Sequence, residues 1–208
     1  GVRLVGSEMC IRDRAIAIEK WNLHKRIALN IINLIGTNIV NIILGFMIAT
    51  AFMSMWISNT ATAVMMLPIA IAIVAQLRDN PNTIEDENLN FGKALMLAIA
   101  YSASIGGVAT LIGTPPNLVL AGVVEETFGY EITFAKWFQF GFPISIILLF
   151  ICWKYLTSIA FKFKQKTFPG GKDEIYKQLN ALGKISYEEK LVSGVFAFTA
   201  FAWISRSY

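Results

Sequence analysis

A cluster of hydroxyl and amide side chains lies in the middle of a long uncharged stretch of the sequence. Ser54 and Ser58 are four residues apart, so within one helix they would share a face, and Asn59 and Thr60 follow directly. Hydroxyl, amide and carbonyl oxygens are hard neutral ligands of the kind that Na⁺ accepts, and no carboxylate or imidazole lies nearby in the sequence. The pattern therefore indicates a sodium site. The alternative is that these hydroxyls bond neighbouring helices or their own preceding turn, and spacing alone does not decide between the two.

A second polar interruption falls at Gly113-Thr114-Pro115-Pro116-Asn117. Two prolines remove two amide donors, and the first disfavours a helical conformation in the residue before it, so a helix must break here. Helix ends at the two interruptions would expose N–H groups that suit an anionic substrate and carbonyls that suit a small cation. Phosphate-binding loops with lysine, His-Glu-x-x-His and nucleophile elbows are missing from the sequence, so we expect neither an enzyme nor an organic cofactor.

The composition places these interruptions in a membrane. Of the 208 residues, 55% are hydrophobic and only 15% are charged, whereas a soluble domain carries about 25% charged residues. Residues 27–77, 94–124 and 137–153 contain no Lys, Arg, Asp, Glu or His, and runs of that length are typical of membrane segments. The net charge of +4 does not indicate nucleic-acid binding, because the basic residues flank the apolar runs. We expect an all-α membrane protein.

Residues 36–77 are predicted to form a re-entrant hairpin. An arm at 42–57 would be about 24 Å long, shorter than the hydrocarbon core of about 30 Å. The polar Ser58-Asn59-Thr60 turn follows, and residues 61–77 run back. Irregular backbone is tolerated at membrane depth only where protein or a water-filled cavity satisfies it. Two full spans with a tight outer turn are the alternative.

Residues 93–124 are predicted to form a discontinuous transmembrane helix broken at residues 113–117, with a simple proline kink as the alternative. The remaining ranges are expected to be non-native adapter-like sequence (1–14), an amphipathic interfacial helix (15–35), a transmembrane helix (134–156), a basic segment (157–190) and the start of a truncated transmembrane helix (191–208). Residues 125–131 carry acids only, whereas residues 154–190 are rich in lysine. The lysine-rich side of a multi-pass protein of the cell membrane is expected to be cytoplasmic, with Lys162, Lys164 and Lys166 near anionic lipid headgroups.

Two stretches carry a resemblance to a known family. MWISNTATAVMMLP at residues 55–68 and AYSASIGGVATLIGTPPNLVLAG at residues 100–122 are together similar to the first half of the divalent anion/sodium symporter family, the sodium-coupled dicarboxylate and citrate carriers. The resemblance implies an elevator-type carrier built from two inverted repeats, a homodimer when full length, which couples Na⁺ to a substrate such as succinate, malate, fumarate or citrate. Only the first repeat is present, so this chain alone is expected not to transport.

The resemblance also implies roles for individual residues. One Na⁺ would be held by Ser54, Ser58, Asn59 and the backbone at Gly113. The substrate would be contacted by Asn59, Thr60, Thr114 and Pro115. A sodium-independent anion exchanger of the same superfamily is the alternative within transport, but exchanger-like relatives follow the Asn-Thr pair with Ala-Arg and glycines, whereas Ala61-Thr62-Ala63-Val64 follows here. A membrane scaffold subunit is the alternative outside transport, and it would need neither interruption to be polar.

Overall fold

The computed structural model describes residues 23–35, 38–78, 85–163, 176–177, 179–183 and 185–205. The named elements are α2 (Leu23–Ile35), α3 (Ile39–Ser54), α4 (Asn59–Arg78), α5 (Glu85–Val108), α6 (Pro115–Phe128), α7 (Phe134–Tyr155), the π-helical turn η1 (Leu156–Ala160) and α9 (Tyr187–Ser205). These described ranges contain helices and no strand, which confirms the predicted all-α class for them. Residues 1–22, 164–175 and 206–208 lie outside the described residues, and with them the adapter-like segment, Lys164 and Lys166.

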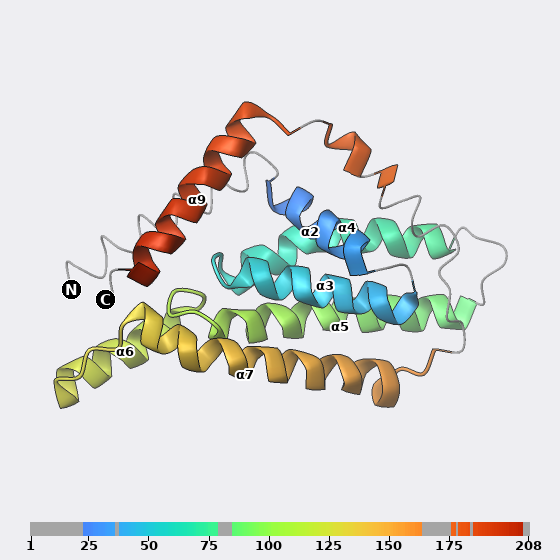
Figure 1. Ribbon diagram of the computed structural model, residues 1–208. Coiled ribbons are helices and arrows are strands. Elements are labelled where there is room, and N and C mark those ends of the chain that lie inside the picture. Colours follow the sequence, from blue (N-terminus) through green and yellow to red (C-terminus); the bar gives the residue numbers. More distant parts are fainter. Residues whose placement is uncertain are drawn as a thin grey trace.

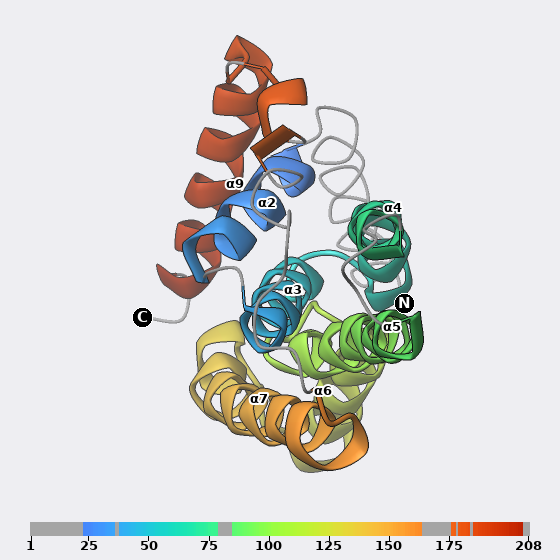
Figure 2. The same cartoon turned by 90° about the vertical axis from the view of Figure 1, so that its right-hand side faces the viewer.

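Helices α3, α4 and α5 form the centre of the structure. Figure 1 shows α3 and α5 side by side and parallel, with α4 running back in the opposite direction, and Figure 2 shows α7 on the far side of α3 and α5 from α2 and α9. The helices share one hydrophobic core, in which Phe46 of α3, Ile73 of α4 and Leu95 of α5 are fully buried. Helix α2 contributes Leu29 and Ile32 to the same core, so it packs directly on the bundle.

A short turn joins α3 to α4. Helix α3 ends at Ser54, and Ser58 then caps α4, because its Oγ accepts a hydrogen bond from the amide of Ala61 at 3.3 Å and its carbonyl accepts one from the amide of Thr62 at 2.9 Å. The prediction that Ser54 and Ser58 share one helix face is therefore wrong. Asn59 is the first residue of α4 rather than part of a loop.

The discontinuous helix is interrupted earlier than the sequence suggested. Helix α5 ends at Val108, residues 109–114 are not helical, and α6 begins at Pro115. Placing the interruption at residues 113–117 is therefore corrected: both prolines lie in the first turn of α6. Proline is favoured there because the first turn of a helix does not use its N–H groups, and the fixed φ of proline suits a helix start.

Two helices are long and apolar enough to cross a membrane, judged by length and composition within the described residues. They are Asn88–Val108 in α5 and Phe134–Ala160, which comprises α7 and η1 and extends beyond the predicted end at residue 156. Ile39–Ser54 and Asn59–Ala75 are shorter apolar helices. Only 11% of the apolar window in Phe134–Ala160 is buried, so this helix presents large apolar side chains such as Phe140 and Ile147 to its surroundings.

A buried ion pair connects the start of α9 to α2. Ser186 and Glu189 form a reciprocal capping box, in which the Ser186 amide donates to Glu189 Oε2 at 2.8 Å and the Glu189 amide donates to Ser186 Oγ at 3.1 Å. Arg26 of α2 donates from Nε to Glu189 Oε1 at 3.2 Å. The same guanidinium donates to the carbonyls of Leu182 and Gly183. These contacts hold the first turn of α9 against α2.

Candidate functional site

The turn between α3 and α4 packs against the interruption between α5 and α6. Thr110, in the α5–α6 loop, donates a hydrogen bond from Oγ1 to the carbonyl oxygen of Met55 at 2.5 Å. The backbones also approach closely: a Cβ on Gly106 would lie 2.6 Å from the Cα of Ala51, and a Cβ on Gly107 would overlap the side-chain amide of Asn59. The adjacent glycines therefore allow the end of α5 to reach the turn.

Three oxygen atoms meet at the centre of this contact. Ser54 is fully buried, and its Oγ lies 2.7 Å from Asn59 Oδ1 and 2.6 Å from the carbonyl oxygen of Ala103. A serine hydroxyl has one proton to donate, so it can satisfy only one of these two acceptors at a time. With Oδ1 toward Ser54, one of the two close contacts therefore has no proton in it, and a cation bound beside the cluster would remove the repulsion between those two oxygens.

The N-terminus of α4 offers hydrogen-bond donors beside the oxygen cluster. Ser58 satisfies the amides of Ala61 and Thr62. The described structure gives no hydrogen-bond acceptor to the amides of Asn59 and Thr60, which lie at the positive end of the α4 dipole. An anion can be bound by such an arrangement.

The N-terminus of α6 differs from that of α4. Its first two residues, Pro115 and Pro116, have no N–H group, and the amide of Asn117 donates to the carbonyl of Thr114 at 3.1 Å. The sequence-based expectation that helix starts at both interruptions expose amides is therefore correct only for α4.

The last four carbonyls of α5 lack partners further along their own helix, and other groups satisfy each of them. The carbonyl–donor pairs are Ile105 with Ser145 Oγ at 3.0 Å, Gly106 with the Ala109 amide at 3.0 Å, Gly107 with Asn117 Nδ2 at 2.9 Å, and Val108 with Trp137 Nε1 at 2.9 Å. Asn117 Nδ2 also donates to the Thr110 carbonyl at 2.8 Å. The carbonyl end of α5 is thus closed by α6 and α7.

The predicted site residues are only partly in mutual contact. Ser54 and Asn59 are bonded directly, and Gly113 is buried next to Gly107, where a Cβ would lie 2.5 Å from the Gly107 carbonyl oxygen. Within the described residues no hydrogen bond joins Asn59 to Thr114 or Pro115, the other predicted residues across the interruption. Thr114 precedes α6 and is partly buried, and three predicted residues are exposed: Ser58, Thr60 and Pro115.

Several residues that bond at the site cannot be recognised from the two sequence motifs. Thr110, Trp137 and Ser145 were not singled out, and Asn117 was noted only as part of the break. The available signal for Thr110 and Asn117 was their polar side chains within the charge-free run of residues 94–124. Two further buried hydroxyls, Thr50 and Thr62, have no hydrogen-bond partner in the structure. In the described part of the chain there is no group of three His, Cys, Asp or Glu side chains that could hold a metal ion.

Comparison with known proteins agrees with the membrane assignment. The family model for the sodium:sulfate symporter transmembrane region matches residues 9–208. The chain is 50% identical over 196 residues to the sodium-dependent dicarboxylate transporter SdcS of Staphylococcus saprophyticus, and 49% identical over 196 residues to that of Staphylococcus aureus strain USA300. Each alignment covers 93% of this chain and 38% of the relative, so the chain spans less than half of the length of these relatives.

These matches confirm the resemblance inferred from the two motifs, and with it the prediction of an integral membrane protein. The matched stretch includes α2 to α9, the α3–α4 turn and the α5–α6 loop. Since the family model covers nearly the whole sequence, the chain belongs to the sodium:sulfate symporter family.

Proposed function

We propose that the complete protein is a sodium-coupled symporter for dicarboxylates and that this chain supplies one half of its binding site. The observation that carries the proposal is the buried Ser54 Oγ, which lies 2.7 Å from the side-chain amide of Asn59 and 2.6 Å from the Ala103 carbonyl oxygen and so gathers neutral oxygen ligands beside the α3–α4 turn. The names of the staphylococcal relatives support both the ion and the class of substrate.

The proposed sodium ligands are Ser54 and Asn59, with the backbone at Gly113 and the cap residue Ser58. Neutral oxygens suit Na⁺, and Ser54 and Asn59 already hold theirs 2.7 Å apart. Thr50 lies one helical turn from Ser54 on the same helix, and Thr62 follows Asn59 by three residues, so two unpaired hydroxyls lie close along the chain to the proposed site.

The proposed substrate contacts begin at the α4 N-terminus. The amides of Asn59 and Thr60 and the positive end of the α4 dipole would hold one carboxylate, with Thr114 and Pro115 closing the opposite side. Residues 27–77 and 94–124 contain no Lys, Arg or His, so these two stretches offer a dianion no cationic side chain. Uncompensated buried charges cost several kcal/mol each, and bound sodium ions would supply the missing positive charge.

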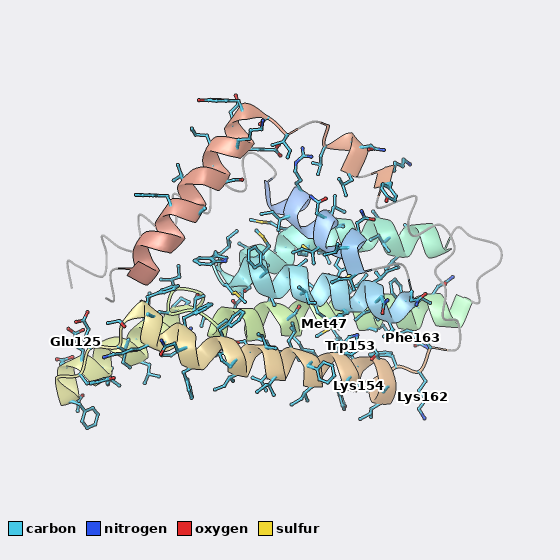
Figure 3. All side chains as sticks on the ribbon, in the orientation of Figure 1. Met47, Glu125, Trp153, Lys154, Lys162 and Phe163 are labelled. Carbon is cyan, nitrogen blue, oxygen red and sulfur yellow. The ribbon has the colours of Figure 1, made fainter. Side chains whose placement is uncertain are left out.

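We place the site inside the membrane, with α3 and α4 as a re-entrant hairpin. Helix α6 continues past the level at which α3 and α4 meet (Figure 1), and its residues 115–124 carry no charge, so uncharged helix extends beyond the α3–α4 turn. Glu125 on α6 and Lys154 and Lys162 near the end of α7 lie at opposite ends of the structure (Figure 3), which supports a cytoplasmic location for the lysine end. Because the helices share one core, we propose that the bundle moves as a rigid body in an elevator-type cycle of a homodimer.

The proposal is tested by succinate uptake into liposomes that contain the full-length protein, with either sodium or choline outside. We expect uptake in sodium only. Ser54→Ala should raise the half-saturating sodium concentration by about tenfold or more, because it removes a ligand and a buried hydrogen bond. Ser104→Ala is the matched control, since Ser104 is exposed on α5 and bonds only the carbonyl of Ala100 in its own helix.

The same assay separates the alternatives. Succinate exchange that proceeds equally in choline would replace the proposal with a sodium-independent exchanger. Normal expression without uptake or exchange in either medium would favour a scaffold subunit. The isolated 208-residue chain is expected to be inactive, because the proposed site is incomplete without the rest of the protein.

A further inference from the structure

The contact between Ser54 and Asn59 permits two arrangements of protons on the same heavy atoms. The oxygen and nitrogen ends of an asparagine amide have nearly the same shape, so the side chain can turn over in place. With Oδ1 toward Ser54, as the structure has it, the single hydroxyl proton is shared between Oδ1 and the Ala103 carbonyl. With Nδ2 toward Ser54, the amide donates to Oγ, and Ser54 donates to Ala103, so both contacts contain a proton.

A cation decides which arrangement is favoured. Without one, the arrangement with Nδ2 toward Ser54 is lower in energy, because a buried acceptor without a donor loses its hydrogen bond. With Na⁺ at the cluster, the arrangement with Oδ1 toward Ser54 is favoured, because the ion binds oxygen lone pairs and repels N–H groups. The surroundings permit both, since a glycine at position 107 faces the amide and leaves it room that a Cβ would occupy.

We propose that the Asn59 amide is a sodium-controlled switch that sets which atom faces the substrate. This inference rests on the proposed function and adds a mechanism of coupling to it. Asn59 is only partly buried, and in the described structure its Nδ2 donates to no protein atom, so the outward end of the amide is free for a ligand. With sodium bound, that end is an NH₂ group that donates to a carboxylate. Without sodium it is an oxygen that repels a carboxylate.

The switch makes substrate binding depend on sodium without a helix movement at this site. A hydrogen bond from an amide to a charged carboxylate is worth about a tenfold to a hundredfold change in affinity, and turning the amide replaces that bond with repulsion. By linkage, the substrate should raise the affinity for sodium by the same factor.

The test is magic-angle-spinning NMR of the full-length protein, labelled with ¹⁵N asparagine, in lipid discs containing sodium or choline and no substrate. The Asn59 side-chain resonance is assigned by its loss in Asn59→Ser. We expect this resonance to shift between sodium and choline, and the shift to vanish in Ser54→Ala. The side-chain resonance of Asn117 is the internal control and should stay in place, because its amide is held by the Gly107 and Thr110 carbonyls.

Thermal unfolding, measured in parallel, distinguishes a failure of the amide switch from a failure of the proposed function. If sodium stabilises the wild-type protein but the Asn59 resonance does not move, the switch is overturned and the sodium site stands. If sodium neither stabilises the protein nor moves the resonance, and uptake is independent of sodium, both the switch and the proposed function are overturned. A moving resonance together with sodium-dependent stability supports the sodium site, and it supports the switch when the ¹⁵N–¹³C dipolar coupling between Asn59 Nδ2 and ¹³C-labelled Ser54 Cβ is stronger in choline than in sodium. An equal coupling in the two media overturns the switch.

Discussion

Thr110 and Met55, which are 55 residues apart in the sequence, are joined by a hydrogen bond from the threonine hydroxyl to the methionine carbonyl. Met55 follows the last residue of α3, and Thr110 lies in the loop between α5 and α6. Because Thr110 is fully buried, its hydroxyl has no solvent to bond instead. This bond fixes the distance between the two interruptions that form the candidate site.

Replacing threonine by valine should therefore have different effects at two buried positions. Thr110→Val leaves the Met55 carbonyl without its donor and is expected to lower the free energy of unfolding by about 1–3 kcal/mol. Thr62→Val should be neutral or stabilising, because the buried Thr62 hydroxyl has no partner to lose. Thermal unfolding of the full-length protein in detergent measures both. Equal destabilisation at the two positions would contradict the assigned bond. Thr110→Ser keeps the hydroxyl and should retain most of the stability.

Glycine-to-alanine substitutions test the close approach of α5 to Asn59. A Cβ on Gly107 would collide with the Asn59 amide, so Gly107→Ala is expected to weaken sodium activation of transport by about tenfold or more. Gly122→Ala on α6 is the matched control, because no atom lies within 4 Å of a Cβ at that position. The half-saturating sodium concentration for uptake is the measurement, and an unchanged value in Gly107→Ala would remove Asn59 from the site.

Removing the Asn117 side chain should destabilise the interruption. Asn117→Ala removes the donor of two carbonyls, those of Gly107 and Thr110. Because both acceptors then lack a partner, we expect the free energy of unfolding to fall by about 2–4 kcal/mol. Asn41→Ala is a suitable comparison, because Asn41 makes one longer bond of 3.3 Å to the Ile35 carbonyl. Thermal unfolding should show a clearly larger shift for Asn117→Ala, and similar shifts would argue against a structural role for the Asn117 amide.

The ion pair between α2 and α9 predicts a local change in stability. Arg26→Gln leaves the Glu189 carboxylate buried without its partner, which costs about 3–5 kcal/mol where such pairs are broken. Amide hydrogen exchange in the first turn of α9 should accelerate in this variant. Glu188→Gln is the control, since Glu188 is exposed in the same turn and should leave the exchange rates unchanged. Unchanged exchange in Arg26→Gln would show that the pair does not hold α9.

The sequence allowed the helices and the existence of both interruptions to be predicted, because these depend on local chemistry. Charge-free runs, a proline pair and a Ser-Asn-Thr turn act within a few residues. The start of α4 could have been placed more accurately, because serine is a preferred N-cap residue and Ser58 caps this helix. The end of α5 could not, because the groups that satisfy its carbonyls come from Asn117, Trp137 and Ser145 further along the chain.

The contacts of the candidate site depend on how the helices pack. Ser54 was selected from its spacing to Ser58, yet it bonds Asn59 across the turn and the backbone of Ala103 in α5. No pattern in a single segment specifies that carbonyl, because the contact depends on the parallel packing of α3 and α5. Gly106 and Gly107 indicate a close approach, but their partners in α3 and α4 become known only from the structure.

The proline pair at the start of α6 limits how the candidate site can recognise an anion. Of the two helix starts at the candidate site, α4 has free backbone N–H groups and α6 begins with two prolines. We therefore expect the backbone here to bind one carboxylate of a diacid and to make no contact with the other carboxylate. Discrimination between a four-carbon diacid and a short monoacid must then come from residues outside the described helices. Substitutions confined to α4 should lower the affinity for the diacid and for the monoacid by the same factor.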